Sequence, residues 1–320
     1  MKAIVVHEFG GPETLKFEET PTPTPAAGQV LVRIHAAGVN PYDTYMRAGV
    51  YAIKPPLPYT PGSDGGGIVE AVGEGVSTVN TGDRVYVAKT LTGAYAEFAL
   101  ALAEQVHPLP TNISFSQGAG VWVPYGTAYH ALRQCADARP GETVLIHGAS
   151  GGVGIAAVQF ARSLGLVVLG TAGSERGREL VKSEGAQHVF DHTKPGYTDE
   201  ILAATCGQGV NIILEMLANV NLGQDLKLLA QRGRVVVIGS RGDVSISPRD
   251  LMSRRASIRA FTLWGINESE EKEIHAAIYA GLENDTLRPV VGKELPFSGA
   301  SGAHKEVLEA GAYGKIVLVS

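Results

Sequence analysis

The sequence of 320 residues predicts an α/β protein in which a doubly wound parallel sheet is joined to a second, mainly β domain. Residues 1–122 alternate short apolar runs with turn residues, a pattern typical of short strands in a compact β domain. In residues 123–255, β-branched runs alternate with amphipathic segments, as expected for βαβ units on a sheet buried on both faces. A chain of this length commonly divides its core between two domains.

Short apolar runs with period two define the strands expected in the first part. They are AIVVHEF (3–9), QVLVRIHAAGV (29–39), GGGIVEAVG (65–73), GDRVYVA (82–88) and GAYAEFAL (93–100). The proline-dense segments 21–28 and 53–62 predict surface connections and not helices, because proline lacks the N–H that a helix interior needs.

The middle part alternates predicted helices and strands. Helices are expected at SQGAGVWVPYGTAYHALRQCA (116–136), IAAVQFARSLG (155–165), RGRELVKSEGA (176–186), TDEILAATC (198–206) and LGQDLKLLA (222–230). Strands are expected at TVLI (143–146), LVVLGTAGS (166–174), HVFDH (188–192), VNIILEMLA (210–218) and GRVVVIGS (233–240). Residues 256–320, with a helix at 269–282 and a strand at 314–319, are expected to complete the first domain and to leave a cleft between the two.

Composition limits the possible partners and compartment. The net charge of -5 is spread along the chain without an acidic or basic block, so nucleic acid or an anionic membrane is not indicated as the main partner. Cys135 and Cys206 are the two cysteines and form no CxxC motif, which predicts neither a disulfide framework nor a structural zinc site. With no secretory signal or membrane-spanning apolar run recognised, we expect a cytoplasmic protein.

Residues 147–154, HGASGGVG, carry the strongest sequence motif. The motif follows a predicted strand and precedes a predicted helix, and it matches the dinucleotide fingerprint with Ala149 at the first glycine position. Gly151 would let the backbone approach a diphosphate, and Gly154 would let the helix pack on the strand. Ser150 is expected to cap the helix. The motif alone is weak evidence, but its place between a strand and a helix favours a cofactor site.

The next strand end bears on the choice of cofactor. An NAD site would place a carboxylate there, whereas this sequence offers Gly173 and Ser174 after GTA, with Glu175 one step later. Donors for a phosphate are available nearby at Arg176, Arg178, Lys182 and His192. This pattern favours NADPH over NADH, although for Arg178 and Lys182 the solvated face of a helix is the favoured explanation.

Two later loops are expected at the same edge of the sheet, where ligands of doubly wound folds bind. Asn221 follows the strand NIILEM, and Gly239, Ser240 and Arg241 follow GRVVV. These residues are candidates for contacts to the nicotinamide half. Glycine-containing turns after strands also occur for purely structural reasons.

Motifs along nearly the whole chain resemble the zeta-crystallin-like quinone oxidoreductases, a zinc-free branch of the medium-chain dehydrogenase/reductase superfamily. The motifs are EFGGPE (8–13), GVNPYDTY (38–45), LPYTPGSD (57–64), GAYAEFAL (93–100), PYGTAYHAL (124–132), HGASGGVG (147–154), GTAGS (170–174), EMLANVN (215–221) and GSRG (239–242). One departure is the bulky Trp122 beside PYGTAY.

The resemblance implies a GroES-like catalytic domain made from both chain ends, a Rossmann domain between them, NADPH as hydride donor and a quinone as acceptor. It also implies a homo-oligomer, a dimer or a tetramer. The NADPH contacts that it implies, with Ser174 added from the strand end, are Tyr45, Ser150, Gly151, Gly152, Val153, Gly173, Ser174, His192, Asn221, Ile238, Gly239, Ser240, Arg241, Phe261, Thr262 and Leu263.

Zinc-dependent relatives hold a catalytic zinc ion with a cysteine after the first long strand and a histidine in a GHE motif. Asn40 and Ser63 stand at those places here, so no metal is expected. Without a metal to acidify a bound hydroxyl, alcohol oxidation is disfavoured, whereas a quinone accepts hydride readily and needs only donors for its oxygen.

Asn40, Tyr45 and Tyr51 fall in one loop region and are the candidate catalytic donors. Tyr45 and Tyr51, with Tyr125 and Thr127, are also the candidate substrate contacts. The alternative is that a tyrosine hydroxyl only satisfies a buried carbonyl. Neither Asp43 nor Asp64 is required as a general base, because water can supply the proton in a reductase, and Asp64 is interpreted as structural.

The leading hypothesis is therefore NADPH-dependent quinone reduction in a zinc-free cleft between the domains. One alternative keeps the fold and cofactor and reduces the carbon–carbon double bond of an alkenal or enone. Another is a catalytically silent NADPH-binding protein of the crystallin kind, since fold does not dictate activity.

Overall fold

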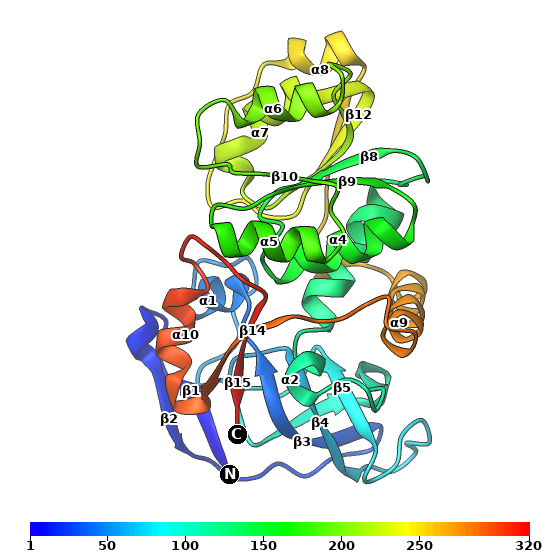
Figure 1. Cartoon of the computed structure of the whole chain (residues 1–320). Coiled ribbons are helices and arrows are strands. Elements are labelled where there is room, and N and C mark those ends of the chain that lie inside the picture. Colours follow the sequence, from blue (N-terminus) through cyan, green and yellow to red (C-terminus); the bar gives the residue numbers. More distant parts are fainter. The chain divides into compact units, whose positions relative to one another are not determined.

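The computed structural model describes residues 1–320 and confirms the predicted α/β class. The chain divides into two compact units (Figure 1). Unit 1 comprises Met1–Val123, Tyr279–Glu309 and Gly314–Ser320, and unit 2 comprises Pro124–Ile278 and Ala310–Tyr313.

Unit 1 is built on a seven-stranded sheet with a path β14-β15-β3-β4-β5-β7, in which β6 also pairs with β3, and on a two-stranded sheet β1-β2. Its strands are β1 Lys2–Val6, β2 Leu15–Glu19, β3 Gln29–Gly38, β4 Asp64–Val72, β5 Arg84–Ala88, β6 Phe98–Leu102, β7 Val106–Pro108, β14 Val291–Pro296 and β15 Lys315–Val319. Its α-helices are α1 Pro41–Arg47, α2 Phe115–Gly118 and α10 Ala300–Glu306, and its 3-10 turns are Pro12–Thr14, Ala103–Gln105 and Phe297–Gly299.

Strand β3 organises this unit because it pairs antiparallel with β4, β6 and β15. Val30, Val32 and Ile34 alternate along it and enter the hydrophobic core, as the period of two predicts. The pairing with β15 brings the last strand of the chain beside the segment that leads into α1. Asp64, the first residue of β4, pairs in register with Gly38 at the end of β3.

Unit 2 is a six-stranded parallel sheet with the order β10-β9-β8-β11-β12-β13. Its strands are β8 Thr143–Ile146, β9 Val167–Thr171, β10 His188–Phe190, β11 Val210–Glu215, β12 Leu229–Val237 and β13 Ser257–Ala260. Its α-helices are α3 Thr127–Tyr129, α4 Gly152–Ser163, α5 Glu175–Ser183, α6 Tyr197–Ala204, α7 Ala218–Leu228 and α8 Pro248–Arg254, and its shorter helical turns are His130–Cys135 and Leu263–Gly265. Helix α9, Glu268–Glu283, and the π-helical turn Trp122–Gly126 extend across the division between the units.

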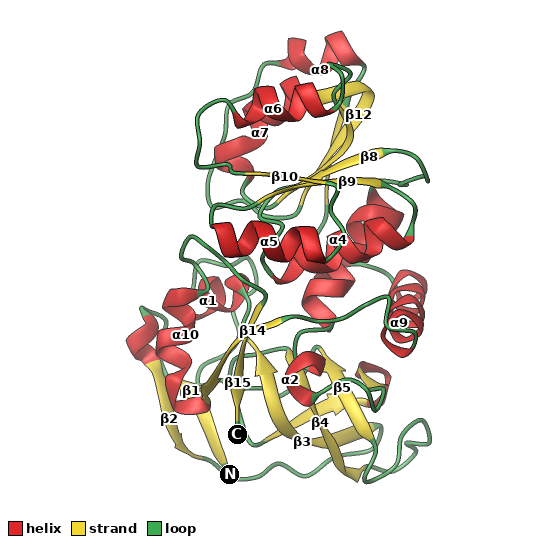
Figure 2. Ribbon diagram, viewed as in Figure 1, coloured by secondary structure: helices red, strands yellow, loops and turns green.

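The strand order of unit 2 is that of the dinucleotide-binding doubly wound fold. Helices α4 and α5 cover one face of the sheet, and α6 and α7 cover the other (Figure 2). The chain changes from one face to the other between the neighbouring strands β8 and β11, so the segments that follow these two strands lie at the topological switch point.

Three parts of the sequence prediction differ from the structure. Residues 256–278 belong to unit 2 rather than to the first domain, because β13 pairs in parallel with β12 and extends the same sheet. The helix expected at 116–136 is divided into α2, α3 and two π-helical turns. The segment after Asn40, expected as a loop, forms α1, with Pro41 at its first turn, where a missing N–H is tolerated.

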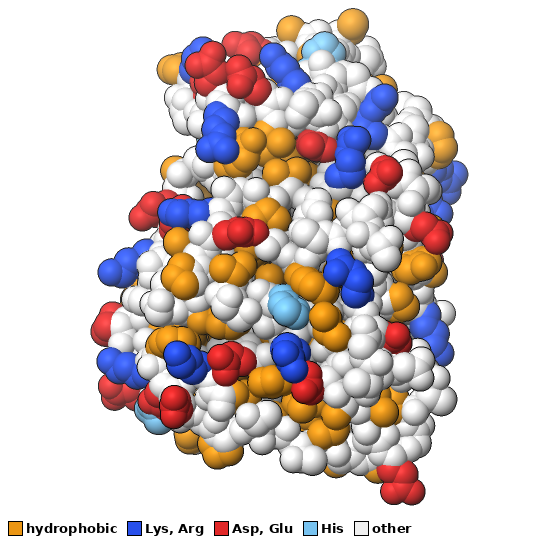
Figure 3. All heavy atoms as spheres, turned by 60° about the horizontal axis from the view of Figure 1, so that its bottom comes forward, with side chains coloured by type: hydrophobic (Ala, Val, Ile, Leu, Met, Phe, Trp, Pro, Cys, Tyr) orange, Lys and Arg blue, Asp and Glu red, His pale blue; other side chains and the backbone are white.

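Charges of both signs are spread over the face of the molecule drawn in Figure 3, in line with the absence of charged blocks in the sequence. None of the helices combines the length and the apolar character that crossing a bilayer requires.

Candidate functional site

The fingerprint turn joins β8 to α4 at the switch point. Helix α4 begins at Gly152, after Gly151 in an extended conformation. The first backbone bond into the helix runs from the N–H of Ile155 to the carbonyl of Gly151, so the N–H groups of Gly152, Val153 and Gly154 have no backbone acceptor. Three open donors at the positive end of a twelve-residue helix form an anion site suited to a diphosphate.

Two glycines of this turn have different steric roles. A Cβ on Gly154 would lie 2.4 Å from the carbonyl oxygen of Gly148 and 2.6 Å from the backbone of Ala149, so only glycine lets α4 pack here. A Cβ on Gly151 would lie 3.5 Å from Cβ of Ala312 and from the carbonyl oxygen of Gly148, an ordinary contact distance, so a small side chain would not clash with the protein here. The close packing at Gly154 agrees with the role that the fingerprint assigns to it, and the role of Gly151 beside a diphosphate stays a prediction.

Ser150 does not cap α4, contrary to the prediction. Its Oγ donates to the carbonyl of Ala312 at 2.7 Å, and the N-cap position is Gly151. The bond ties the fingerprint turn to the segment Ala310–Tyr313, which belongs to the same unit. No side-chain oxygen therefore occupies the donors of the first turn of α4, and they stay available for a ligand.

The other predicted cofactor residues of unit 2 follow the carboxyl ends of the parallel strands, which share one edge of the sheet. Gly173 and Ser174 follow β9, His192 follows β10, Asn221 lies in the first turn of α7 after β11, Ile238, Gly239, Ser240 and Arg241 follow β12, and Phe261, Thr262 and Leu263 follow β13. The sheet thus gathers these residues at one edge. Tyr45 is the exception, because it lies on α1 of unit 1.

The end of β9 carries donors and no carboxylate. The Oγ of Ser174 accepts from the N–H of Gly177 and caps α5. A Cβ on Gly173 would lie 3.1 Å from Nε2 of His192, which places the imidazole beside the strand end. Burial lowers the pKa of His192, with a further contribution from the charge of His147.

Two nearby arginines have partners within unit 2. Arg178 forms an ion pair of 2.9 Å with Asp191, which agrees with the structural alternative for this residue. The guanidinium of the exposed Arg176 stacks 3.7 Å from the ring centre of Tyr313. Lys182 is exposed on α5.

The loops after β11 and β12 are joined by hydrogen bonds. The N–H of Ala218 donates to the carbonyl of Gly239 at 2.9 Å, and the N–H of Arg241 donates to Oδ1 of Asn219 at 2.9 Å. Nδ2 of Asn221 donates to Oε1 of Glu215 at 3.2 Å. The candidate nicotinamide contacts therefore belong to one connected structure.

In unit 1, Asn40 lies in a buried polar group that we call the Lys315 network, formed by Asn40, Asp64 and Lys315. Nδ2 of Asn40 donates to Oδ2 of Asp64 at 2.9 Å, and the Lys315 ammonium donates to Oδ1 of Asn40. The ammonium also lies 3.6 Å from Oδ2 of Asp64, and the N–H of Val123 donates to Oδ1 of Asp64. Asn40, predicted as a catalytic donor, is 2% exposed and uses its amide within this network.

Burial acts on the charges of this network. Burial raises the pKa of Asp64, and the Lys315 ammonium opposes that shift. Burial likewise lowers the pKa of Lys315, opposed by Asp64 and Asp43. The interpretation of Asp64 as structural agrees with these contacts.

A second set of buried side chains is joined by hydrogen bonds and includes Asp43 on α1. Oδ2 of Asp43 accepts from the N–H of Asn40 at 2.9 Å and from the hydroxyl of Tyr95 at 3.3 Å. His304 Nε2 lies 3.3 Å from the same hydroxyl. Burial raises the pKa of Asp43 to about 7 and, with the charge of Arg47, lowers that of His304 to about 3.

The two predicted tyrosine donors differ in their surroundings. Tyr45 is partly exposed on α1, and its hydroxyl forms no hydrogen bond. Tyr51, also partly exposed, lies beyond the helix with its ring centre 6.0 Å from that of Tyr42. The Tyr42 hydroxyl is hydrogen bonded to Oγ of Ser63, and burial with the Asp43 and Asp64 carboxylates raises its pKa well above the ordinary value. Tyr42 therefore stays protonated near neutral pH.

The predicted substrate contacts at 125 and 127 are buried in unit 2. Tyr125 is 2% exposed, and its hydroxyl donates to Oε1 of Gln159 at 2.8 Å, so it packs against α4 and is not free to meet a substrate. Thr127 is 6% exposed on α3. Trp122, in unit 1, is fully buried with the Lys89 ammonium 5.3 Å from its ring, so it is a core residue.

Sequence reasoning missed Lys315, Tyr95, His304 and Tyr42 as members of the polar groups around α1. Lys315 opens the strand GKIVLV, and no local pattern distinguishes it from an exposed lysine. A buried partner 275 residues away cannot be read from spacing. Tyr42 was within sequence reach, because it stands in the same short segment as Asn40 and Tyr45.

Two family models match the chain. The model described as "Alcohol dehydrogenase GroES-like domain" matches residues 26–111. The model described as "Zinc-binding dehydrogenase" matches residues 152–278. These matches cover parts of unit 1 and unit 2, respectively.

Comparisons with individual proteins and with solved structures identify the family more specifically than the two family models do. The quinone oxidoreductase of Rattus norvegicus is 49% identical over 100% of this chain and 98% of its own. The structure of Escherichia coli quinone oxidoreductase complexed with NADPH has a TM-score of 0.89 at 28% identity, with full coverage of both chains. That of the CurK enoyl reductase has a TM-score of 0.90 at 28% identity, covering 99% of this chain and 98% of that one. The chain belongs to the quinone oxidoreductase family of the medium-chain dehydrogenase/reductase superfamily.

Proposed function

We propose that this protein reduces quinones with NADPH. The observation that carries the proposal is the fingerprint turn at the switch point, with three unpaired N–H groups at the start of α4. The names of the relatives support the acceptor, and the NADPH complex of the E. coli structure supports the cofactor.

The residues at the edge of the sheet fit a phosphorylated dinucleotide. The open N–H groups suit the diphosphate, and the lack of a side chain on Gly151 leaves space for it. Ser174 and His192 offer donors at the end of β9, where a ribose-binding carboxylate is missing. When bound, NADPH supplies a hydride equivalent to the acceptor.

The acceptor needs hydrogen-bond donors for the oxygen that gains negative charge. The hydroxyls of Tyr45 and Tyr51 are the proposed donors, because both rings are accessible and the Tyr45 hydroxyl has no partner within the protein. Asn40 acts indirectly, since its amide holds Asp64 and Lys315 beneath α1.

The side chains at the two zinc-ligand places support a reaction without a metal. Asn40 contributes an amide already bound to Asp64 and Lys315, and Ser63 contributes a hydroxyl bound to Tyr42. Neither is the thiolate or imidazole ligand that zinc favours. A quinone does not need the acidified hydroxyl that a metal provides to an alcohol.

A second candidate function is reduction of the carbon–carbon double bond of an alkenal. It is favoured by the similarity to an enoyl reductase structure, and it uses the same cofactor site. A silent NADPH-binding protein is the remaining alternative and predicts binding without turnover.

The test compares acceptors and cofactors under steady-state conditions. A naphthoquinone and a 2-alkenal are each assayed with NADPH and with NADH. We expect kcat/KM to be at least about tenfold higher for the quinone than for the alkenal, and higher with NADPH than with NADH. Faster turnover of the alkenal would favour the second function, and binding without turnover of either acceptor would contradict both.

We also propose a cytoplasmic location and a homo-oligomer, a dimer or a tetramer, on the basis of the family. Sedimentation velocity measures the oligomeric state directly.

A further inference from the structure

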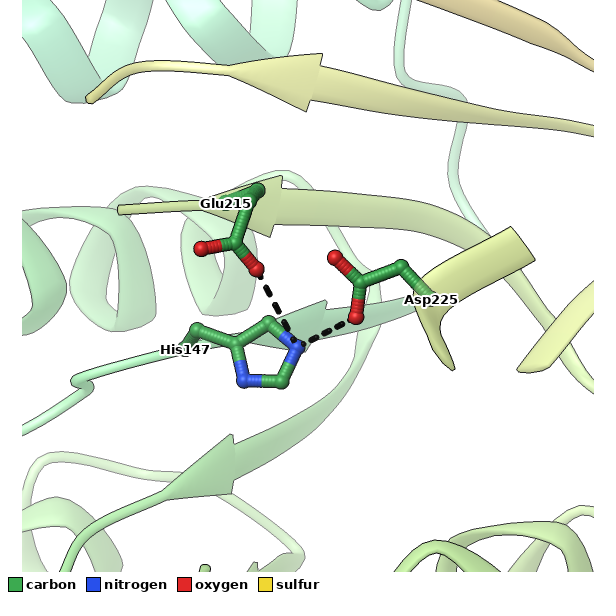
Figure 4. Close-up of side chains that lie close together, drawn as sticks. All are labelled: His147, Glu215 and Asp225. Atoms are coloured by element: carbon green, nitrogen blue, oxygen red, sulfur yellow. Dashed lines mark hydrogen bonds and ion pairs between the residues drawn. The ribbon is translucent and has the colours of Figure 1, made fainter. Parts of the chain in front are cut away.

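Three titratable side chains at the switch point are not among the predicted cofactor contacts. His147 is the first residue after β8, Glu215 is the last residue of β11, and Asp225 lies in α7 (Figure 4). Their exposed fractions are 4%, 0% and 1%. Nε2 of His147 lies 2.8 Å from Oδ1 of Asp225 and 3.6 Å from Oε2 of Glu215. We call these three residues the His147 cluster.

Two oxygens of the His147 cluster lack a hydrogen-bond partner. They are Oε2 of Glu215 and Oδ2 of Asp225. Burying two ionised carboxylates with one imidazolium leaves a net negative charge and unsatisfied acceptors, which is unfavourable. One further proton on a carboxyl group would make the group of three neutral and would supply a donor.

The electrostatics of the cluster agree with a held proton. Burial and the neighbouring Asp225 raise the pKa of Glu215 to about 7, against the effect of His147. Burial opposes a charge on His147, but the Asp225 and Glu215 carboxylates outweigh it and raise the pKa of the imidazole. These directions agree with a protonated Glu215 carboxyl beside a charged His147 imidazole.

Glu215 also connects the two loops that carry the candidate nicotinamide contacts. Its Oε1 accepts from the N–H of Leu217 and from Nδ2 of Asn221. Its backbone carbonyl accepts from the N–H groups of Ile238 and Gly239, at 2.8 and 3.3 Å. One buried residue thus holds the start of α7 and the turn after β12.

The bond to Asn221 fixes which way its amide faces. Oε1 accepts from Leu217, so the nitrogen of the Asn221 amide, and not its oxygen, is the partner that Glu215 requires. The Oδ1 atom and the second N–H of the amide are left for another partner. An amide with one free acceptor and one free donor matches the carboxamide of a nicotinamide ring.

We propose that the His147 cluster positions the Asn221 amide for the nicotinamide half of NADPH, and that binding of the cofactor is coupled to the proton that the cluster holds. The inference rests on the proposed function for the identity of the cofactor. His147, Glu215 and Asp225 are positioning residues, since they act through Asn221 and the loops beside it.

Other titratable groups interact with the cluster. His192 is affected by the charge of His147, and its pKa is lowered by burial and by that charge. Tyr197 on α6 has its pKa raised by burial and by Asp225 and Glu215. The hydroxyl of Thr171 lies 3.4 Å from Nδ1 of His147. When the cluster loses its proton, it gains a negative charge close to the fingerprint turn, which begins at His147 and is expected to hold the diphosphate. This negative charge opposes binding of the cofactor.

Two variants of Glu215 separate positioning from protonation. Glu215→Ala removes the acceptor for Leu217 and Asn221, whereas Glu215→Gln keeps an oxygen acceptor and removes the titrating carboxyl. Glu200→Gln, exposed on α6, is the matched control. Circular dichroism establishes that each variant folds, and Asn221→Ala removes the positioned amide while leaving the cluster intact.

The measurement is calorimetric binding of NADPH and of adenosine 2′,5′-bisphosphate, which lacks the nicotinamide half. We expect Glu215→Ala and Asn221→Ala each to weaken NADPH binding more than about tenfold and to change binding of the fragment less than about twofold. The double variant is expected to equal the single variants, because Glu215 acts through Asn221. Glu215→Gln is expected to recover most of the affinity.

The proton is measured by repeating the titrations above neutral pH in two buffers of different ionisation enthalpy. Wild type and Glu200→Gln are expected to take up more protons on binding NADPH than Glu215→Gln does. NADPH affinity of Glu215→Ala within about twofold of wild type would overturn the positioning role. Equal proton uptake by Glu215→Gln and wild type would overturn the coupling. The coupling would also be overturned if wild type bound one metal ion per chain and Asp225→Asn did not, because the cluster would then hold a metal ion in place of a proton. Failure of wild type to bind NADPH would instead contradict the proposed function.

Discussion

The two units each bury a polar group, and the groups differ in how their carboxylates are satisfied. In the Lys315 network, both oxygens of Asp64 accept hydrogen bonds and a lysine supplies the opposite charge. In the His147 cluster, two carboxylate oxygens have no donor and the only cation is an imidazole. The first group pairs its carboxylate with a lysine beside the start of α1, whereas the second can gain or lose a proton. Burial of charge therefore serves structure in one unit and, in our account, cofactor binding in the other.

The largest effect is expected from removing the cation of the Lys315 network. Lys315→Met leaves Asp64 buried without its counter-charge, so the free energy of unfolding should fall by about 3–5 kcal/mol. Urea denaturation measures it. Adding Asp64→Asn should restore part of the loss, because the orphaned charge is gone.

Lys305→Met, at an exposed lysine, is the control and should change stability by less than about 0.5 kcal/mol. If Lys315→Met lowered the free energy of unfolding no more than Lys305→Met does, the buried ion pair of the Lys315 network would not stabilise the fold.

The next largest effect is expected from two glycines of the fingerprint turn, which follows β8 in the same unit as the His147 cluster. Gly151→Val should leave the fold intact, because its backbone is extended and its Cβ makes only ordinary contacts at 3.5 Å, but it should weaken NADPH binding by about a hundredfold. Gly154→Val should instead destabilise the protein by about 1–3 kcal/mol, since its Cβ meets the backbone of Gly148 and Ala149. Fluorescence titration and thermal unfolding measure the two quantities. Unchanged NADPH affinity in Gly151→Val would remove the diphosphate assignment.

The pH dependence of stability tests one buried carboxyl in each unit. The pKa values of Asp43 and Glu215 are raised by burial to about 7 in the folded protein, above their unfolded values. The stability that each contributes is therefore fully present below the unfolded pKa of about 4 and is lost as the pH rises from there through the folded pKa of about 7. Each group can lower the free energy of unfolding by up to about 1.4 kcal/mol per pH unit in this window.

Asp43→Asn and Glu215→Gln should each flatten the decline in stability between about pH 5 and pH 7. Urea denaturation at several pH values measures the slopes. A slope as steep in both variants as in wild type would show that these carboxyls do not hold protons near neutrality.

The smallest expected effect is on the choice of cofactor. His192→Ala removes one donor beside Gly173 and should reduce the preference for NADPH over NADH about fivefold. Lys182→Ala, at an exposed position on α5, should change the preference little. The ratio of kcat/KM for the two cofactors is the readout, and equal use of NADH by wild type would refute the interpretation of the β9 end.

The fold class could be predicted from the sequence, because apolar strands that alternate with amphipathic helices usually form a doubly wound parallel sheet. It was insufficient for β13, whose four residues are partly exposed at the edge of the sheet and show no clear period. Helix α1 had a signal, Asn40 followed by Pro41 at the first helical position, but the proline-dense segment beyond it favoured a loop.

The cofactor side of the site was more accessible to sequence reasoning than the catalytic side. The cofactor residues follow strands in register, so the pattern that predicts the strands also places them at one edge. The buried contacts of Asn40 and Tyr125 could not be predicted, because their partners, Lys315 and Gln159, come from segments far along the chain. Burial of a polar side chain depends on such partners and leaves no trace in local spacing.

The most direct test of the account is quinone reduction by protein dialysed against a strong chelator, with metal content measured on the same sample. We expect full NADPH-dependent turnover of a naphthoquinone by the metal-depleted protein, no gain on adding zinc, and no oxidation of a primary alcohol. Activity that disappears with the chelator and returns with one zinc ion per chain would contradict the account.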